Sequence, residues 1–405
     1  MVSRPESLRP IRSTWPRHDE DEVEAAAAVL RSGRVNARVH GEHCTAFENE
    51  FAAYCGMPYG IAAANGTLAL DLALRALGIG EGDEVIVPAR SFFATASCVL
   101  ALGARPVFAD IEAETHNIDP ASVKRMIGDA TKAVIVVHLA GRPCDMESLV
   151  ELCREHNLLL IEDCAQAHGA EYRGRMLGSF GDAAAFSFCT DKIMTTGGEG
   201  GMLLVREADH WRAAWSYKDH GKNPDKVLNA APGNEFRYVH DSFGNNFRLT
   251  EMQAAIGRIQ LTKLPDWLAA RRRNAAILEE HLRDHPAVEI LSVPREVRHA
   301  YYKYYFMIRS DHQVPFEDVG ALIGALRAAG VPAASGSCPD MSLEEAFRAD
   351  PPRRDGDLAV AHDVGRRSVM LPVDPTLDEA DMERMAMAVC DVLSNFEAAE
   401  GMVSA

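Results

Sequence analysis

One stretch of the chain passes from a short apolar strand into a polar, glycine-rich turn, with a lysine at the junction; it reads Ala185-Phe186-Ser187-Phe188-Cys189-Thr190-Asp191-Lys192-Ile193-Met194-Thr195-Thr196-Gly197-Gly198-Glu199-Gly200-Gly201. A lysine at the end of a buried strand is costly unless its amine is neutralised, paired or chemically converted, because burial disfavours the charged form. Formation of an imine with an aldehyde cofactor is one such conversion, and pyridoxal phosphate chemistry uses lysine in this way. This stretch alone leaves two interpretations of Lys192 open, a Schiff-base lysine and a surface lysine in a loop.

Short apolar runs on either side of this stretch alternate with helix-like segments such as 67–77, 94–102, 121–127 and 146–156. Strands that alternate with helices indicate a mostly parallel sheet covered on both faces. The sequence therefore predicts one large α/β domain built on seven strands. The strand candidates are residues 60–63, 84–88, 105–109, 133–137, 158–162, 183–188 and 202–205.

Polar and aromatic side chains follow several of these strands at the point where each strand ends. Gly66 and Thr67 come after the first strand, Phe92 after the second, Asp163 after the fifth and Lys192 after the sixth. In open α/β sheets, ligands bind beyond the carboxyl ends of the strands, where the following loops open. We therefore expect these residues to converge on one crevice, although they lie far apart in the sequence.

The texture of the sequence changes near residue 264, and the remaining segments predict a smaller α+β domain. They are a long helix over 267–281, strands over 288–293 and 301–308, and helices over 316–330 and 377–396. We expect two domains on this basis. Residues 1–265 form an N-terminal segment and the large domain, and residues 266–405 form the small C-terminal domain.

Composition excludes several classes of protein. A net charge of −17 argues against a general nucleic-acid binder and against a protein that binds anionic membranes, since both need basic surface. The nine cysteines include no C-x-x-C pair, so their spacing fits neither a zinc site nor a disulfide framework. No signal peptide and no membrane span is visible, and we expect a cytoplasmic protein with no metal site and no membrane or nucleic-acid partner.

Two of the strand ends carry groups suited to a charged, flat cofactor. The segment Asn65-Gly66-Thr67 predicts a helix N-terminus, where backbone N–H groups and a hydroxyl suit a phosphate, although an ordinary helix cap has the same appearance. Asp163 follows a buried strand, and its carboxylate suits a protonated pyridine nitrogen; a helix cap is again the alternative. His168 is more typical of a packed side chain than of a catalyst.

Taken together, the motifs resemble those of the DegT/DnrJ/EryC1/StrS family, pyridoxal-phosphate-dependent sugar aminotransferases of fold type I. The resemblance runs from about residue 32 to the last helix and is most specific between residues 65 and 253. The motifs that carry it are Asn65-Gly66-Thr67, Gly103-Ala104-Arg105-Pro106-Val107-Phe108-Ala109-Asp110-Ile111, Asn117-Ile118-Asp119-Pro120, Glu162-Asp163-Cys164-Ala165-Gln166-Ala167, Ser187-Phe188 followed by Lys192, Thr195-Thr196 with Gly198-Glu199-Gly200-Gly201, and Gly244-Asn245-Asn246-Phe247-Arg248.

The resemblance implies a role for each matching residue. Lys192 matches the Schiff-base lysine and Asp163 the partner of the pyridine nitrogen, and both are implied to be catalytic. Gln166 matches the residue near the phenolic oxygen of the cofactor. The other implied cofactor contacts are Gly66, Thr67 and Ser187 at the phosphate, Phe92 on the ring face, and Asn246, which in this family reaches the phosphate of the neighbouring subunit's cofactor.

The implied activity is the transfer of an amino group from glutamate or glutamine to a keto-sugar, with the sugar linked to a nucleotide, by a homodimer with shared active sites. Such a reaction serves amino-sugar biosynthesis for a surface polysaccharide or a natural product. An aminotransferase of a cyclitol or another non-nucleotide ketone is the alternative, and a non-catalytic cofactor-binding regulator is a more distant one.

Some residues leave the substrate open. Arg90 and the segment 335–339 depart from the pattern that is common in the family. A diphosphate would need cations, and the candidates are Lys218, Lys222, Arg237 and Lys303, for each of which an exposed surface charge is the simpler interpretation.

Overall fold

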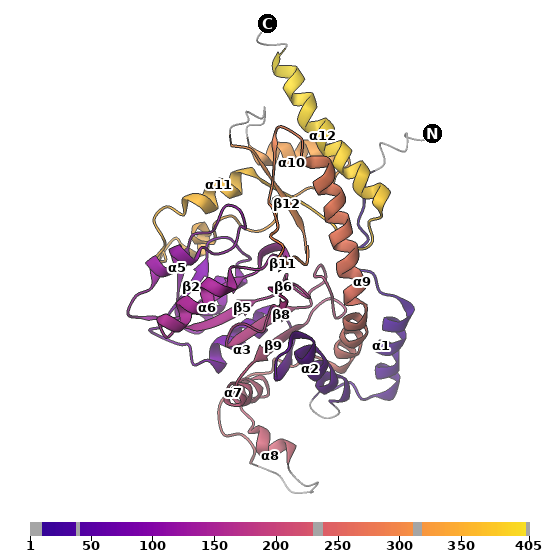
Figure 1. Cartoon of the computed structure of the whole chain (residues 1–405). Coiled ribbons are helices and arrows are strands. Elements are labelled where there is room, and N and C mark those ends of the chain that lie inside the picture. Colours follow the sequence, from indigo (N-terminus) through magenta and orange to yellow (C-terminus); the bar gives the residue numbers. More distant parts are fainter. Residues whose placement is uncertain (1–9, 38–40, 230–237, 311–317, 402–405) are drawn as a thin grey trace.

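The computed structural model describes residues 10–37, 41–229, 238–310 and 318–401. A seven-stranded sheet lies in the lower part of the molecule in Figure 1, and a smaller unit built around β12 (Tyr304–Ile308), α10 (Val319–Ala328) and α12 (Glu379–Gly401) lies above it. The predicted strands are all present. In spatial order they are β1 (Tyr59–Ala63), β9 (Gly201–Val205), β8 (Ala183–Ser187), β5 (Leu159–Asp163), β4 (Thr131–Val137), β2 (Glu84–Pro88) and β3 (Arg105–Ala109).

The sheet is parallel except for β9, which runs antiparallel to both β1 and β8. Its side chains are buried on both faces, and neighbouring residues alternate between two hydrophobic clusters. Ile86 of β2 belongs to one cluster, whereas Val85 and Val87 belong to the other. Burial on both faces explains why the strands appear in the sequence as continuous apolar runs.

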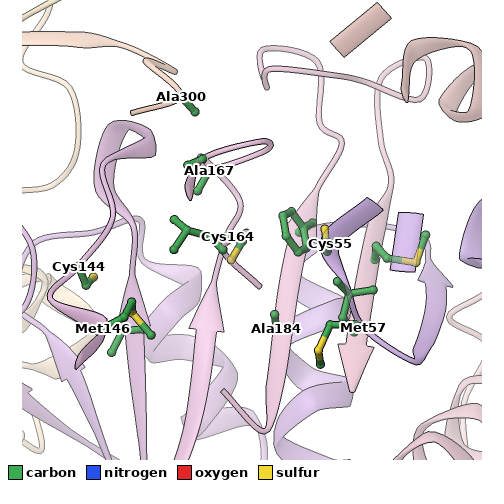
Figure 2. Packing of buried hydrophobic residues seen from close by; sticks show 14 of the residues in the cluster. Cys55, Met57, Cys144, Met146, Cys164, Ala167, Ala184 and Ala300 are labelled. Atoms are coloured by element: carbon green, nitrogen blue, oxygen red, sulfur yellow. The ribbon is translucent and has the colours of Figure 1, made fainter. Parts of the chain in front are cut away.

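Helices cover both faces of the sheet. One face packs against α2 (Glu42–Cys55), α5 (Pro120–Met126), α6 (Met146–Glu155) and the first half of α9 (Glu251–Leu282). The other face packs against α3 (Gly66–Ala76), α4 (Ala94–Ala101), α7 (Ala208–Lys218) and α11 (Ala359–Arg367). Figure 2 shows part of the first cluster, with Cys144 and Met146 on the left of Cys164 and with Cys55 and Met57 on its right.

Helix α9 corrects the prediction of a helix that begins at residue 267. It begins at Glu251, where Thr250 and Gln253 form a capping box, and it continues through Pro265. Because α9 packs against α1 (Glu20–Ser32), α2 and α12 (Glu379–Gly401), tertiary contacts outweigh the local cost of the proline. The predicted boundary after residue 265 falls inside α9, and we keep it as a proposal.

The smaller unit contains an antiparallel sheet of β10 (Val288–Ile290), β12 (Tyr304–Ile308) and β13 (Ser368–Leu371), packed on α10 (Val319–Ala328), α12 and the second half of α9. The sequence reading missed α11 and β13. The start of the helix expected from residue 316 lies outside the described residues.

The remaining elements are short. They are the strands β6 (Glu171–Tyr172), β7 (Arg175–Met176) and β11 (Val297–Arg298), the helix α8 (Pro224–Leu228), and 3-10 turns at Leu139–Gly141, Met341–Leu343 and Glu345–Phe347. Among the residues that the structure describes, no helix is both long and apolar enough to cross a membrane.

Candidate active site

A cavity of about 710 Å³ opens at the carboxyl ends of β2, β5 and β8, and side chains of the smaller unit, including Tyr302 and Tyr305, line its opposite side. The structure brings together every predicted site residue except Asn246. Those that line the cavity are Gly66, Thr67, Phe92, Asp163, Gln166, Ser187 and Lys192. The strand ends therefore converge as the sequence predicted.

Asp163 is the buried carboxylate of the site. Its side chain accepts hydrogen bonds from the Thr95 hydroxyl, at 3.0 Å, and from the backbone N–H of Ala165, at 3.1 Å. Burial raises the pKa of Asp163 above its ordinary value, although those two donors and the charge of Lys192 oppose the rise. A cationic partner in the cavity would stabilise the ionised form of this group.

Gln166 lines the cavity with its amide oxygen already engaged. The backbone N–H of Ala140 donates to that oxygen at 2.7 Å. The side-chain NH₂ group of Gln166 therefore remains as the donor that this residue can offer to a ligand oxygen.

The N-terminus of α3 forms a third part of the wall. Asn65 caps the helix by accepting a hydrogen bond from Leu68 N at 2.9 Å, so the predicted cap is present. A Cβ atom added at Gly66 would lie 2.6 Å from the Cβ atom of Ser187 on β8. The glycine thus allows the helix terminus to approach the strand, and its backbone N–H groups suit an anion.

Lys192 extends toward Tyr302, and its amine lies 4.9 Å from the centroid of that ring. The Tyr302 hydroxyl donates a hydrogen bond to the carboxylate of Asp191. Burial would raise the pKa of Asp191, but the charge of Lys192, the Tyr302 hydroxyl and the charge of Lys303 together hold it below its ordinary value. Asp191 lines the cavity, and 57% of its side chain is exposed to solvent.

Two of the predicted cofactor contacts, Phe92 and Asn246, are exposed to solvent. Phe92 lines it with 69% of its surface exposed, which is unusual for a phenylalanine and leaves a ring face open to a ligand. Asn246 is exposed and does not line the cavity of its own chain. It lies in the segment 238–250, in which 98% of the surface of Phe243 is accessible to solvent.

The four basic residues that the sequence offered as diphosphate ligands lie in different environments. Lys218 is buried against Glu48 at 3.0 Å and Lys222 pairs with Asp219 at 2.9 Å, so their interpretation as exposed surface charges was wrong. Arg237 lies outside the described residues. Lys303, with 23% of its side chain exposed, lines the cavity.

Arg90 is fully buried, which its sequence context did not indicate. Its guanidinium donates to Ser368 Oγ at 2.9 Å and lies 5.6 Å from the ring centroid of Tyr305. The Tyr305 hydroxyl in turn accepts the N–H of Ser337. Arg90 thus supports the segment that departs from the family pattern, rather than lining the cavity itself.

The residues present fit pyridoxal phosphate, which the sequence resemblance implies. A helix N-terminus offers donors to a phosphate, a buried carboxylate that needs a cation suits a protonated pyridine nitrogen, a lysine amine suits an aldehyde, and Phe92 offers a ring face. The sequence did not predict the roles of Thr95, which positions Asp163, and of Tyr302, whose ring lies near two lysine amines. The hydroxyl of Thr95, in the first turn of the helix after β2, gave no signal that distinguished it from its neighbours.

Comparison with known proteins agrees with this geometry. Residues 16–390 match the sequence profile of the DegT/DnrJ/EryC1/StrS aminotransferase family. GDP-perosamine synthase of Caulobacter vibrioides is 38% identical over 357 residues, which cover 87% of this chain and 91% of that protein. L-glutamine:2-deoxy-scyllo-inosose aminotransferase of Streptomyces fradiae is 36% identical over 399 residues, covering 94% and 93%. A solved aminotransferase structure from Psychrobacter cryohalolentis matches with a TM-score of 0.91 and 44% identity, covering 95% of this chain and 99% of that one.

Proposed function

This chain belongs to the DegT/DnrJ/EryC1/StrS aminotransferase family, and from that premise we propose that it transfers an amino group from glutamate or glutamine to a nucleotide-linked keto-sugar. The chain has the α/β architecture of fold type I enzymes and is a sugar aminotransferase that depends on pyridoxal phosphate. The sugar, its nucleotide link and the donor are the proposed part, and the product would be an amino sugar for a surface polysaccharide or a natural product.

One observation carries the proposal. Lys192, Asp163, Gln166 and the N-terminus of α3 at Gly66 line the same cavity, although they come from three separate segments of the chain. A protein that only binds the cofactor for regulation has no need for a buried carboxylate at the ring nitrogen together with a lysine amine. This combination favours turnover over the regulatory alternative.

The side chains have distinct tasks in this proposal. When bound, pyridoxal phosphate supplies an electron sink for the bonds at the reacting carbon. Asp163 accepts a hydrogen bond from the ring N–H and so keeps the proton on that nitrogen. The Lys192 amine takes the proton from the α-carbon of the donor, which becomes a 2-oxo acid, and returns a proton when the ketone is aminated. Gln166 would donate a hydrogen bond from its side-chain NH₂ group to the phenolic oxygen of the cofactor, and the backbone N–H groups at Gly66 and Thr67 would hold the phosphate.

A cyclitol ketone is the second candidate substrate. The observation that favours it is the 36% identity to an inosose aminotransferase, which is close to the 38% identity to a GDP-sugar enzyme. The same cavity residues would serve both reactions. The two candidates differ in the group attached to the ketone ring, so substrate specificity distinguishes them.

We also propose a cytoplasmic homodimer in which each subunit completes the other's site. The exposed position of Asn246, outside the cavity of its own chain, supports this arrangement. The exposed ring of Phe243 in the same segment supports it too, because aromatic side chains are enriched at protein–protein interfaces.

The first experiment tests the reaction. The purified protein, loaded with pyridoxal phosphate, is incubated with glutamate or glutamine and with a panel of GDP- and dTDP-linked keto-sugars and 2-deoxy-scyllo-inosose. We expect one nucleotide-linked ketone to be aminated, with 2-oxo acid formed in equal amount. Lys192→Ala should abolish turnover and the borohydride-reducible link to the cofactor, whereas Lys124→Ala, an exposed residue of α5, should change neither. Amination of the inosose alone would favour the cyclitol reaction.

The second experiment tests the shared site. Lys192→Ala and Asn246→Ala are each expected to lower activity strongly. If sites are shared, subunit exchange between the two variants restores up to about a quarter of the wild-type activity, since each mixed dimer then holds one intact site. Failure of the mixture to regain activity would argue that Asn246 acts within its own chain.

A further inference from the structure

Two lysine amines lie near the same aromatic ring at the wall of the cavity. The Nζ atom of Lys192 is 4.9 Å from the centroid of the Tyr302 ring, and the Nζ atom of Lys303 is 4.7 Å from it. Both side chains line the cavity. Under the proposed function, Lys192 forms the link to the cofactor and transfers the proton. Lys303 is the lysine at this wall to which that function assigns no role.

The ammonium group of Lys303 has a weak partner. Within the described part of the chain, the carboxylate that pairs with it is that of Asp191, and the Nζ to Oδ2 distance is 4.0 Å. That carboxylate also accepts the Tyr302 hydroxyl. Burial lowers the pKa of Lys303, because the surrounding protein replaces water around the charge. An additional anion in the cavity would therefore stabilise the ammonium group.

The backbone that presents Lys303 is held firmly. Tyr302 N donates to Ala140 O at 2.8 Å, and the buried guanidinium of Arg271 donates to Tyr302 O at 3.2 Å. The next residues belong to the central strand β12 of the small sheet. The side chain of Lys303 thus starts from a fixed backbone position at the cavity wall, which suits the recognition of one particular group.

We propose that Lys303 binds the α-carboxylate of the amino donor, an inference that rests on the proposed function. An α-amino acid has an anionic group one bond away from the carbon that loses its proton. An oriented Cα–H bond requires that this group be held. The charged residues that line the cavity, among those the structure describes, are Asp163, Asp191, Lys192, Glu199, Lys303 and Glu344. With Lys192 engaged, Lys303 is the remaining cation in this set.

The position of Lys303 favours the donor over the diphosphate of a nucleotide-linked sugar. Its amine and the amine of the lysine that moves the proton both lie near the Tyr302 ring, so the two cations serve the same part of the cavity. A diphosphate is several bonds away from a reacting ring carbon, whereas an α-carboxylate is attached to it directly. The same residue thus distinguishes an amino acid from a simple amine.

The test compares L-glutamate with 4-aminobutyrate, which is glutamate without its α-carboxylate. Single-turnover reactions of the cofactor-loaded enzyme give kcat/KM for each amine. In Lys303→Met, we expect kcat/KM for glutamate to fall roughly 10- to 100-fold, the effect of losing one hydrogen bond to a charged group. The rate with 4-aminobutyrate should change less than about twofold. Lys303→Arg should recover part of the loss, and Lys124→Met serves as the control.

Calorimetric binding of glutarate, a dicarboxylate that cannot react, provides a readout independent of turnover and should weaken in Lys303→Met. Equal losses with glutamate and 4-aminobutyrate, or no loss with either, would overturn the proposal while leaving the aminotransferase function in place. Weaker binding of GDP or dTDP in the variant, with glutamate unaffected, would also overturn it. If the wild-type enzyme converts neither glutamate nor glutamine, the proposed function itself has failed.

Discussion

The indole N–H of Trp15 donates a hydrogen bond to the carbonyl oxygen of Lys192 at 2.8 Å, although the two residues lie 177 positions apart in the sequence. The Trp15 ring also meets Trp267 edge-on, with centroids 5.0 Å apart, and lies 5.2 Å from the guanidinium carbon of Arg271. The backbone N–H of Lys192 donates a hydrogen bond to the carbonyl oxygen of Cys189. Both backbone groups of the lysine are therefore fixed, one of them by the N-terminal segment.

Replacing Trp15 with phenylalanine keeps an aromatic ring and removes the donor. We expect the free energy of unfolding to fall by about 1 kcal/mol, the usual contribution of one hydrogen bond. We also expect kcat of the donor half-reaction to fall while KM stays nearly constant, because a displaced lysine affects proton transfer more than binding. Urea unfolding and single-turnover kinetics measure the two effects. Trp211→Phe on α7 is the matched control, and equal kinetic effects from both variants would contradict a positioning role for Trp15.

The close approach of Gly66 to Ser187 leads to a second prediction. A methyl group at residue 66 would lie 2.6 Å from Ser187 Cβ and 3.0 Å from its Oγ, so helix and strand must separate. We expect Gly66→Ala to destabilise the cofactor-free protein by about 1–3 kcal/mol, the usual cost of overpacking. Gly324→Ala is the control, because nothing lies near that position in α10, and it should be neutral or slightly stabilising. A normal cofactor-free Gly66→Ala protein would mean that the glycine serves the phosphate alone.

The sequence predicts those parts of the fold that leave a local pattern, and it does not predict those that depend on contacts between residues distant in the chain. The strands of the large sheet were predictable because burial on both faces leaves continuous apolar runs, as in β2 and β4. The start of α9 was missed because the change in the sequence near residue 264 suggested a later beginning, whereas tertiary packing sets the observed start at Glu251. Two-residue strands such as β6 and β11 are too short to leave a periodic pattern.

The site divides in the same way. Asp163 and Lys192 were predictable because each follows an apolar strand, so topology alone brings them to one edge. Their supporting contacts were not predictable, because they join residues distant in sequence: Thr95 lies 68 positions from Asp163. His168 is a packed side chain, as its sequence context indicated. It packs among phenylalanines such as Phe186, and burial lowers its pKa to about 3.

The exposure of Phe92 predicts a variant that affects the cofactor more than the fold. Since 69% of its surface is accessible, Phe92→Ala should change the free energy of unfolding of the cofactor-free protein by less than about 0.5 kcal/mol. Stacking of two aromatic groups contributes about 1 kcal/mol, so the Kd for pyridoxal phosphate should rise several-fold. Fluorescence titration with the cofactor measures it. Phe92→Tyr should bind normally, and unchanged affinity in Phe92→Ala would exclude stacking.

The neighbouring carboxylates Glu162 and Asp163 have opposite pKa shifts, which predicts opposite effects on stability. Burial would raise the pKa of Glu162, but His138 at 3.2 Å and the N–H groups of Gly181 and Gly178 reverse that effect and lower it. Burial dominates at Asp163 and raises its pKa. The ionised form of Glu162 is therefore stabilised by the protein itself, whereas the ionised form of Asp163 needs an additional cation.

The sign of each effect on stability follows from proton binding. Glu162 binds its proton less readily in the folded state, so its contribution to stability is present above the ordinary glutamate pKa of about 4.3 and is lost as the pH falls. Asp163 binds its proton more readily in the folded state. Its contribution is therefore present below the ordinary aspartate pKa of about 3.9 and is lost as the pH rises through the raised value.

At pH 7 and without cofactor, Glu162→Gln should thus lower the free energy of unfolding, whereas Asp163→Asn should leave it unchanged or raise it. With pyridoxal phosphate bound the order of stability of the two variants changes, because Asp163→Asn loses its interaction with the ring N–H. The same variant should transaminate about 100-fold more slowly or worse. Urea unfolding with and without cofactor, from about pH 3 to pH 8, measures the stability of each variant, and single-turnover kinetics measure the rate of transamination. A cofactor-free Asp163→Asn protein that is clearly less stable at pH 7 would show that the protein alone already satisfies this charge.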